Sequence, residues 1–311
     1  MPAKSIAICN FKGGVGKTVL AVNLATALAN RLQKGGGRVL LMDLDSQANA
    51  SAYMAGRENW RSQLYPNSAK SLFGVLERNL SRGFQPITAD DLVGGEDALL
   101  FWSGDRRSHW TNLFLLPSHH DLWQMEDRLA AEGRRGIALT GMPREIMPFE
   151  LLHEVSAWAR ESFDYIILDC PPGNHHLVQN ALFTAENILV PVIPDWLSSG
   201  GLARLIHTLV EHFQRFQQTS KSVRAIVPTL WDNRLSVFND HKARLANSLY
   251  EDWKTEDRLK KVLKGCELWD GLRRSGPVAN LVEDCRPIVD LSPGDPARSQ
   301  LETMVELISG W

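Results

Sequence analysis

The sequence predicts an α/β protein with a doubly wound, mostly parallel sheet and helices on both faces. Short, continuous apolar runs alternate along the chain with longer stretches in which apolar residues recur at helical spacing. Such uninterrupted runs are typical of strands that are covered on both sides. The first 45 residues already form one strand, helix, strand unit, with a glycine-rich turn between the first strand and the helix.

Six apolar runs are expected to form the sheet. They are residues 5–9, 38–42, 113–116, 165–168, 188–193 and 223–227. Helices are expected at 18–32, 148–161, 202–216 and 240–253. We expect one domain over residues 1–311, with a helical and loop excursion at about 57–112 and a C-terminal helical part at about 235–311.

The composition excludes several classes of protein. A chain of 311 residues that is 44% hydrophobic and 23% charged is not mainly disordered, collagen-like or coiled-coil. The net charge of -2 provides no global attraction to nucleic acid or anionic lipid. Four scattered cysteines favour a reducing compartment, and there is no apolar run of about 18 residues and no signal peptide. We therefore expect a cytoplasmic protein.

The segment KGGVGKT, residues 12–18, carries the strongest functional signal because it lies between the first strand and the first helix. Its glycines, Gly13, Gly14 and Gly16, permit a backbone that wraps around a polyanion with N–H groups pointing inward. Lys17 would bring charge to the β- and γ-phosphates, and Thr18 a hydroxyl to Mg²⁺. The ordinary pattern has glycine at position 11, but Phe11 stands there and Lys12 opens the loop, so this is a deviant form.

Three aspartates follow predicted strands. Asp43 and Asp45 come at the end of the second strand and point the same way if the chain stays extended. One could hold Mg²⁺ or its waters while the other orients an attacking water. Asp169 closes the run YIILD in the manner of a Walker B aspartate. A single strand-end aspartate is as often a turn cap, but three beside a phosphate loop favour metal and hydrolysis.

Five segments carry a family resemblance: KGGVGKT, LLMDLDSQANAS, LFLLPSHHDLWQMEDRL, YIILDCPPG and ILVPVIPDWLSSGGL. In this order, over about residues 4–227, they resemble the ParA/Soj partition branch of the deviant Walker A ATPases, which are relatives of MinD. The resemblance implies a P-loop ATPase domain with ATP and Mg²⁺ as cofactors.

The resemblance also implies roles for individual residues. Lys12 would be the signature lysine that reaches the partner's phosphates across a nucleotide-sandwich dimer, and Asp45 would position the hydrolytic water. The implied catalytic residues are Lys12, Lys17 and Asp45, and the implied metal residues are Thr18, Asp43 and Asp169. The implied nucleotide contacts are Lys12, Gly13, Gly14, Val15, Gly16, Lys17, Thr18, Val19, Pro194 and Thr229. Val19 stands where many relatives have a second threonine, and Thr229 where relatives often use asparagine on the adenine.

The activity implied by the family is slow hydrolysis of ATP to ADP and phosphate. The ATP-bound homodimer would bind DNA nonspecifically and associate with the nucleoid, and a ParB-like or adaptor protein would stimulate hydrolysis and release. Such a cycle segregates or positions a plasmid, a chromosome or a protein cargo.

The expected DNA surface lies in residues 254–274. Its cations are Lys254, Arg258, Lys260, Lys261, Lys264, Arg273 and Arg274. The alternative is a solvated helix face with i,i+4 ion pairs.

Two other functions remain open: a MinD-like membrane-associated regulator and a metabolic P-loop enzyme related to dethiobiotin synthetase or nitrogenase iron protein. The first would use a basic amphipathic C-terminal helix. Here that segment has one arginine against two glutamates, and its apolar stripe is better explained by packing on the core. The second would require turnover of another substrate.

Two pairs of adjacent histidines, His119–His120 and His175–His176, lie in predicted loops. Adjacent histidines point apart in an extended chain, and no cysteine or carboxylate stands at a recognised ligand spacing. Metal binding is therefore not the favoured interpretation of either pair.

Overall fold

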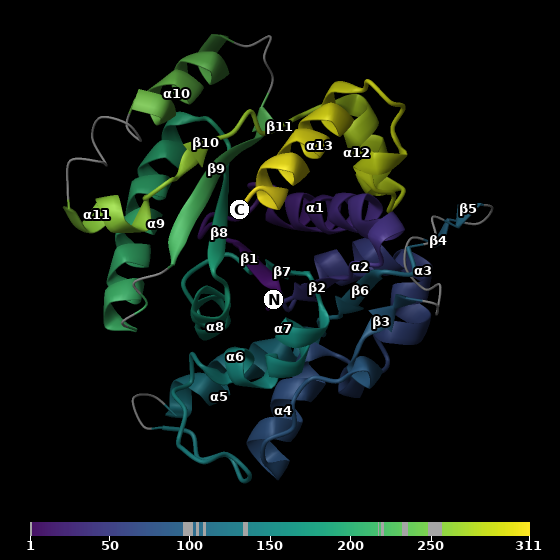
Figure 1. Ribbon diagram of the computed structural model, residues 1–311, viewed down its shortest axis with the longest axis vertical. Helices are drawn as coiled ribbons and strands as arrows, with labels where there is room; N and C mark the ends of the chain where they lie inside the picture. The colour runs from purple at the N-terminus through teal and green to yellow at the C-terminus, as the bar shows by residue number, and fades with distance from the viewer. Residues whose placement is uncertain are drawn as a thin grey trace.

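The computed structural model describes residues 2–95, 102–103, 106–107, 110–132, 136–216, 218, 221–231, 236–247 and 257–311. Its centre is a nine-stranded sheet in the order β10-β9-β8-β1-β7-β2-β6-β3, with β11 also paired to β9 (Figure 1). All pairings in this sheet are parallel except that of β3 with β6. The predicted fold class is confirmed.

All six predicted strands are present. The sheet consists of β1 (Lys4–Ile8), β2 (Val39–Asp43), β3 (Val93–Gly94), β6 (Leu113–Leu116), β7 (Tyr165–Asp169), β8 (Asn187–Val192), β9 (Ser222–Trp231), β10 (Glu267–Leu268) and β11 (Leu272–Arg273). A separate hairpin joins β4 (Trp102–Ser103) to β5 (Arg106–Arg107). The strands β3, β10 and β11 were not predicted, because two residues carry no periodic signal.

The helices are α1 (Lys17–Leu32), α2 (Asn49–Ala55), α3 (Arg57–Asn59), α4 (Leu72–Arg82), α5 (Trp123–Glu132), α6 (Leu151–Val155), α7 (Ala157–Ser162), α8 (His176–Thr184), α9 (Trp196–Arg215), α10 (Ser236–Asn247), α11 (Asp257–Val262), α12 (Gly276–Glu283) and α13 (Pro296–Ser309). The single helix predicted at 148–161 is wrong, since α6 and α7 are separated at Ser156. The Ser156 hydroxyl donates to the His153 carbonyl oxygen at 3.1 Å, a local bond that competes with regular helix. Residues 248–253 of the helix predicted at 240–253 lie outside the described residues.

Successive residues of each central strand face opposite sides of the sheet, and each side has its own apolar core. In β2, Val39 and Leu41 contribute to one core, while Leu40 and Met42 contribute to the other. The first core also contains α1 and α13, and the second contains residues of α4, α5, α6, α8, α9 and α11 (Figure 1). Because both cores lie against the same sheet, we propose that residues 1–311 form one domain.

The C-terminal helix α13 packs on the body of the protein. Its apolar residues Leu301, Met304, Val305 and Ile308 are buried in the same core as α1, which agrees with the packing expected from the sequence. Across the described residues, no helix is long and apolar enough to cross a membrane.

Candidate functional site

The segment KGGVGKT forms the turn between β1 and α1, at the carboxyl edge of the sheet. Gly14 and Gly16 have φ of 72° and 80°, values that glycine adopts without steric cost. The start of the loop is held by Asn10, whose side chain accepts a hydrogen bond from the Lys12 N–H at 2.9 Å and donates to the Pro191 carbonyl at 2.8 Å. The loop is therefore fixed to the end of β8.

Two further contacts hold the loop to neighbouring segments. The Gly173 N–H donates to the Phe11 carbonyl oxygen at 2.9 Å, and the Thr229 hydroxyl donates to the Val15 carbonyl oxygen at 2.7 Å. Thr229 and Val15 are both buried. The hydroxyl implied to contact adenine thus faces the loop backbone, and its role in base recognition stays a prediction.

The two lysines of the loop lie in different surroundings. Lys17 is only 7% exposed, and its Nζ donates to the Lys12 carbonyl oxygen at 3.0 Å, inside the curve of the loop. The Nζ of Lys12 lies 3.6 Å from Oδ2 of Asp195, and both of these side chains are more than one third exposed. The ammonium group of Lys17 therefore lies on the concave side of the loop, whereas that of Lys12 lies at its rim.

Two cavities adjoin at the loop. The larger, about 630 Å³, is lined by Gly13, Gly14, Gly16, Lys17, Thr18, Val19, Asp45, Gln47, Asn49, Ala52, Tyr53, Arg57, Pro172, Leu230, Val282 and Cys285. The smaller, about 240 Å³, shares Gly16, Val19, Leu230 and Val282 with it. It is lined further by Thr229, Leu272, Arg273, Arg274, Ser275, Val278 and Ala279. A loop cavity lined by Lys17, Thr18 and Asp45, next to a mostly apolar cavity with which it shares residues, suits a phosphate chain with an attached base.

Asp43 is a buried acceptor whose oxygens are already engaged. It accepts hydrogen bonds from the Ser51 N–H at 2.8 Å, the Ser51 hydroxyl at 2.7 Å and the Asp45 N–H at 3.1 Å. Burial, opposed by these hydrogen bonds, raises the pKa of Asp43 to about 7. The chain does not stay extended beyond β2, because Asp45 folds back onto Asp43. Asp45 lines the larger cavity, whereas Asp43 is fully buried and is not among the residues that line it.

Asp169 lies opposite Asp43 where β2 and β7 pair, and it is fully buried. Burial raises the pKa of Asp169 well above its ordinary value, and the neighbouring Asp43 adds to the rise, whereas Thr18 and Lys17 oppose it. Neither carboxylate oxygen of Asp169 has a hydrogen bond of regular geometry among the described residues, although the nearby Thr18 hydroxyl favours the charged form. A buried carboxylate with unfilled acceptor positions, next to Thr18, fits Mg²⁺ or one of its water ligands.

The chain matches the model of the AAA domain family AAA_31 over residues 3–223. It belongs to this family. It is 29% identical over 255 residues to the chromosome partitioning protein ParA of Caulobacter vibrioides, covering 80% of this chain and 79% of that protein. It is 28% identical over 234 residues to Soj of Bacillus subtilis, a sporulation initiation inhibitor protein, covering 75% of each. A Cyanothece McdA variant in complex with ATP shares the fold, with TM-score 0.68, 20% identity and coverage of 99% and 96%. The protein is a ParA/MinD-type P-loop ATPase.

In this ATPase the cations expected on DNA lie in two places. Arg258, Lys260, Lys261 and Lys264 are exposed on α11 and just after it, whereas Arg273 and Arg274 line the smaller cavity beside the phosphate loop. Lys260 pairs with Asp257 at 3.0 Å, as in the alternative of a solvated helix face. Lys254 lies outside the described residues. A role on DNA for the cations of α11 stays a prediction.

Several residues at the site were not predicted from the sequence. Asp195, beside Lys12, lies in the segment ILVPVIPDWLSSGGL that carries the resemblance, but no role was assigned to it, and Asn10 precedes the loop pattern. The α12 wall of the smaller cavity comes from a segment with no nucleotide signature. Pro194 also follows β8, and it is not among the residues that line the two cavities.

Proposed function

We propose that this ParA/MinD-type ATPase binds Mg·ATP, dimerises across the nucleotide and hydrolyses it slowly, under stimulation by a ParB-like or adaptor protein. The observation that carries the proposal is the separation of the two loop lysines. Lys17 lies where it can hold the phosphates of its own nucleotide. Lys12 lies at the rim beside Asp195, where a second protomer's phosphates could replace that carboxylate.

Breaking the ion pair between Lys12 and Asp195 requires little energy. An ion pair with both side chains more than one third exposed and an N–O distance of 3.6 Å contributes about 0–1 kcal/mol. A triphosphate offers more negative charge and several acceptor oxygens, so it competes well with one carboxylate. Dimerisation would then depend on the nucleotide rather than on a large permanent interface.

ATP and Mg²⁺ would occupy the two cavities together. The phosphates would lie on the loop against Lys17, with Mg²⁺ near Thr18 and Asp169, and the base would lie in the smaller, mostly apolar cavity. Mg²⁺ would neutralise the charge that develops on the phosphates. Asp45, which lines the larger cavity, would orient the attacking water.

We further propose that the ATP state binds DNA without sequence preference and positions a plasmid, a chromosome or a protein cargo. The exposed cations of α11 support this proposal, because phosphate contacts need accessible Lys and Arg on one face.

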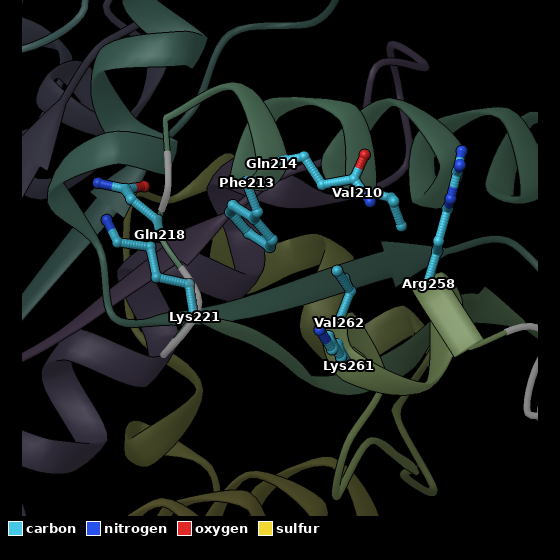
Figure 2. A pocket seen from close by; sticks show the side chains of 8 residues that line it. All are labelled: Val210, Phe213, Gln214, Gln218, Lys221, Arg258, Lys261 and Val262. Carbon is cyan, nitrogen blue, oxygen red and sulfur yellow. The ribbon is translucent and has the colours of Figure 1, made fainter.

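Arg258 and Lys261 lie at a groove of about 300 Å³ between α9 and α11, opposite Val210 and Phe213 (Figure 2). Lys221, at the other end of the groove, donates to the Leu182 carbonyl oxygen, and burial lowers its pKa to about 7.

The test is binding of the purified protein to nonspecific duplex DNA with ATP, with ADP and without nucleotide, over a series of salt concentrations. We expect salt-sensitive binding with ATP only, retained by Asp45→Ala and lost with Lys12→Ala. The double variant Lys260→Glu, Lys261→Glu should lose DNA binding and keep ATP binding. Lys70→Glu, which reverses an exposed cation near α4, is the matched control. If no nucleotide state binds DNA, the DNA proposal fails for the chain acting alone.

A further inference from the structure

His119, His120 and Asp121 form a compact cluster at the start of the segment that leads into α5. One ligand atom of each lies within 4.8 Å of the others, and no further group of three potential ligands came as close in the described part of the chain. Nδ1 of His119 is 3.2 Å from one Asp121 carboxylate oxygen, and Nε2 of His120 is 3.3 Å from the other. The turn at His120 thus joins two side chains that would point apart in an extended chain.

A hydrogen bond from the ring nitrogen that faces away from Asp121 fixes the orientation of His119. It is 4% exposed, and its Nε2 lies 3.0 Å from the Tyr65 carbonyl oxygen, so Nε2 carries the hydrogen and donates. This leaves Nδ1 directed at Asp121. Metal-binding histidines are commonly oriented by such a bond from the other ring nitrogen to a carbonyl. The Tyr65 ring stacks on His120 at 5.1 Å, which restricts the second ligand as well.

The facing atoms of the cluster are held apart by either a proton or a metal ion. Imidazole lone pairs and carboxylate oxygens are all acceptors, so contacts of 3.2 and 3.3 Å require one or the other between them. Asp121 Oδ1 also accepts a hydrogen bond from the Gln124 side chain at 2.9 Å. With metal–ligand bonds of about 2.0–2.1 Å, neighbouring ligands of a tetrahedral site are about 3.3 Å apart. The two separations, each to a different oxygen of Asp121, match that value, and one ligand atom of each of the three residues lies within 4.8 Å of the others. Nδ1 of His119 also accepts from the Asp121 N–H at 3.2 Å, a bond that a metal would replace.

We propose that His119, His120 and Asp121 bind one divalent transition-metal ion of the Zn²⁺ class. Two imidazoles and one carboxylate favour Zn²⁺, Co²⁺, Ni²⁺ or Cu²⁺ over Mg²⁺ and Ca²⁺, which prefer all-oxygen sites. This site is separate from the nucleotide cavity and does not rest on the proposed function.

The site is nevertheless connected to the nucleotide cavity through Ser118, the residue before His119. The Ser118 hydroxyl donates to the Asp45 carbonyl oxygen at 2.7 Å, and its N–H donates to the Ser51 hydroxyl at 2.8 Å. Fixing the cluster with a metal therefore also restrains the segment that carries Asp45.

The test uses untagged, full-length protein that has been treated with a chelator and then dialysed. We expect Co²⁺ to give the visible absorption of a low-symmetry site at one ion per chain, and Zn²⁺ to abolish it. Excess Mg²⁺ should not compete. His120→Asn and Asp121→Asn should each weaken Zn²⁺ binding, measured by calorimetry, by at least about tenfold. His207→Asn, an exposed histidine on α9, is the matched control and should leave the affinity unchanged.

Absence of the Co²⁺ absorption, or equal Zn²⁺ affinity in the wild type and both cluster variants, would overturn the proposal. Circular dichroism of each variant verifies that it is folded. Because His120 is exposed and Asp121 is partly exposed, neither substitution removes a core side chain.

Discussion

Thr229→Val tests whether the bond from β9 to the phosphate loop holds the loop in shape. Valine has nearly the same shape as threonine, so the substitution removes the hydroxyl that donates to Val15 at 2.7 Å and little else. The Val15 carbonyl would lose this donor inside a region where both residues are buried. Leaving a buried acceptor without its donor costs about 1–3 kcal/mol. We expect the free energy of unfolding, measured in urea by tryptophan fluorescence, to fall by that amount.

Thr303→Val is the control for the stability measurement. Thr303 is exposed on α13 and its hydroxyl donates to Ser299 within the helix, so its loss should change the free energy of unfolding by no more than about 0.5 kcal/mol. Because the loop is also the phosphate cradle, Thr229→Val should weaken binding of a fluorescent ATP analogue, and Thr229→Ser should restore it. If Thr229→Val is as stable as Thr303→Val and binds the analogue normally, the hydrogen bond from Thr229 to Val15 does not determine the shape of the loop.

Three further predictions concern Lys17, Asp43 and Leu301. Lys17→Gln should weaken ATP binding at least about tenfold, as measured by equilibrium dialysis, because it removes the buried charge in the loop. Since the pKa of Asp43 is about 7 in the folded protein, against an ordinary value of 3.8, the folded state holds the extra proton between these values. The free energy of unfolding of the nucleotide-free protein should therefore fall with rising pH more than in Asp43→Asn, by about 1.3 kcal/mol from pH 5 to 6 and about 1 kcal/mol from pH 6 to 7, in urea titrations at these pH values. Leu301→Ala should lower the free energy of unfolding by about 2–5 kcal/mol, whereas Leu307→Ala, at an exposed position on the same helix, should change it little.

The fold was predictable where a segment of the sequence has a clear hydrophobic pattern. Of the six strands of the parallel core, four have four apolar residues in succession, and the runs 188–193 and 223–227 have three in succession beside a proline or an arginine, which is enough to mark a buried strand. The strands β3, β10 and β11 have two residues each, and only pairing with a longer neighbour makes them strands. The break at Ser156 depends on a side chain that bonds to its own backbone, which hydrophobic spacing does not report.

The location of the site was predictable from the sequence, but the contacts within it were not. The glycine pattern placed the loop, and the strand-end rule placed the aspartates beside it. One partner of Lys12 is Asp195, far along the chain, and the Thr229 hydroxyl donates to the Val15 carbonyl oxygen. Such pairings depend on the order of strands in the sheet, because β8 and β9 come to lie near β1 only when the sheet is assembled.

The three strand-end aspartates have the same residue type and a similar position, yet their surroundings give them different chemistry. Asp43 accepts three hydrogen bonds from Ser51 and Asp45, which fix the turn after β2, and its role as a metal residue stays a prediction. Asp169, beside Thr18, is fully buried, and its raised pKa keeps it protonated unless a cation or a water comes to stabilise the charged form. Asp45 alone of the three lines the cavity, and its own carbonyl is held by Ser118. The spacing of carboxylates therefore predicts where phosphate chemistry takes place, whereas the hydrogen-bond donors around each carboxylate decide which of them can participate in it.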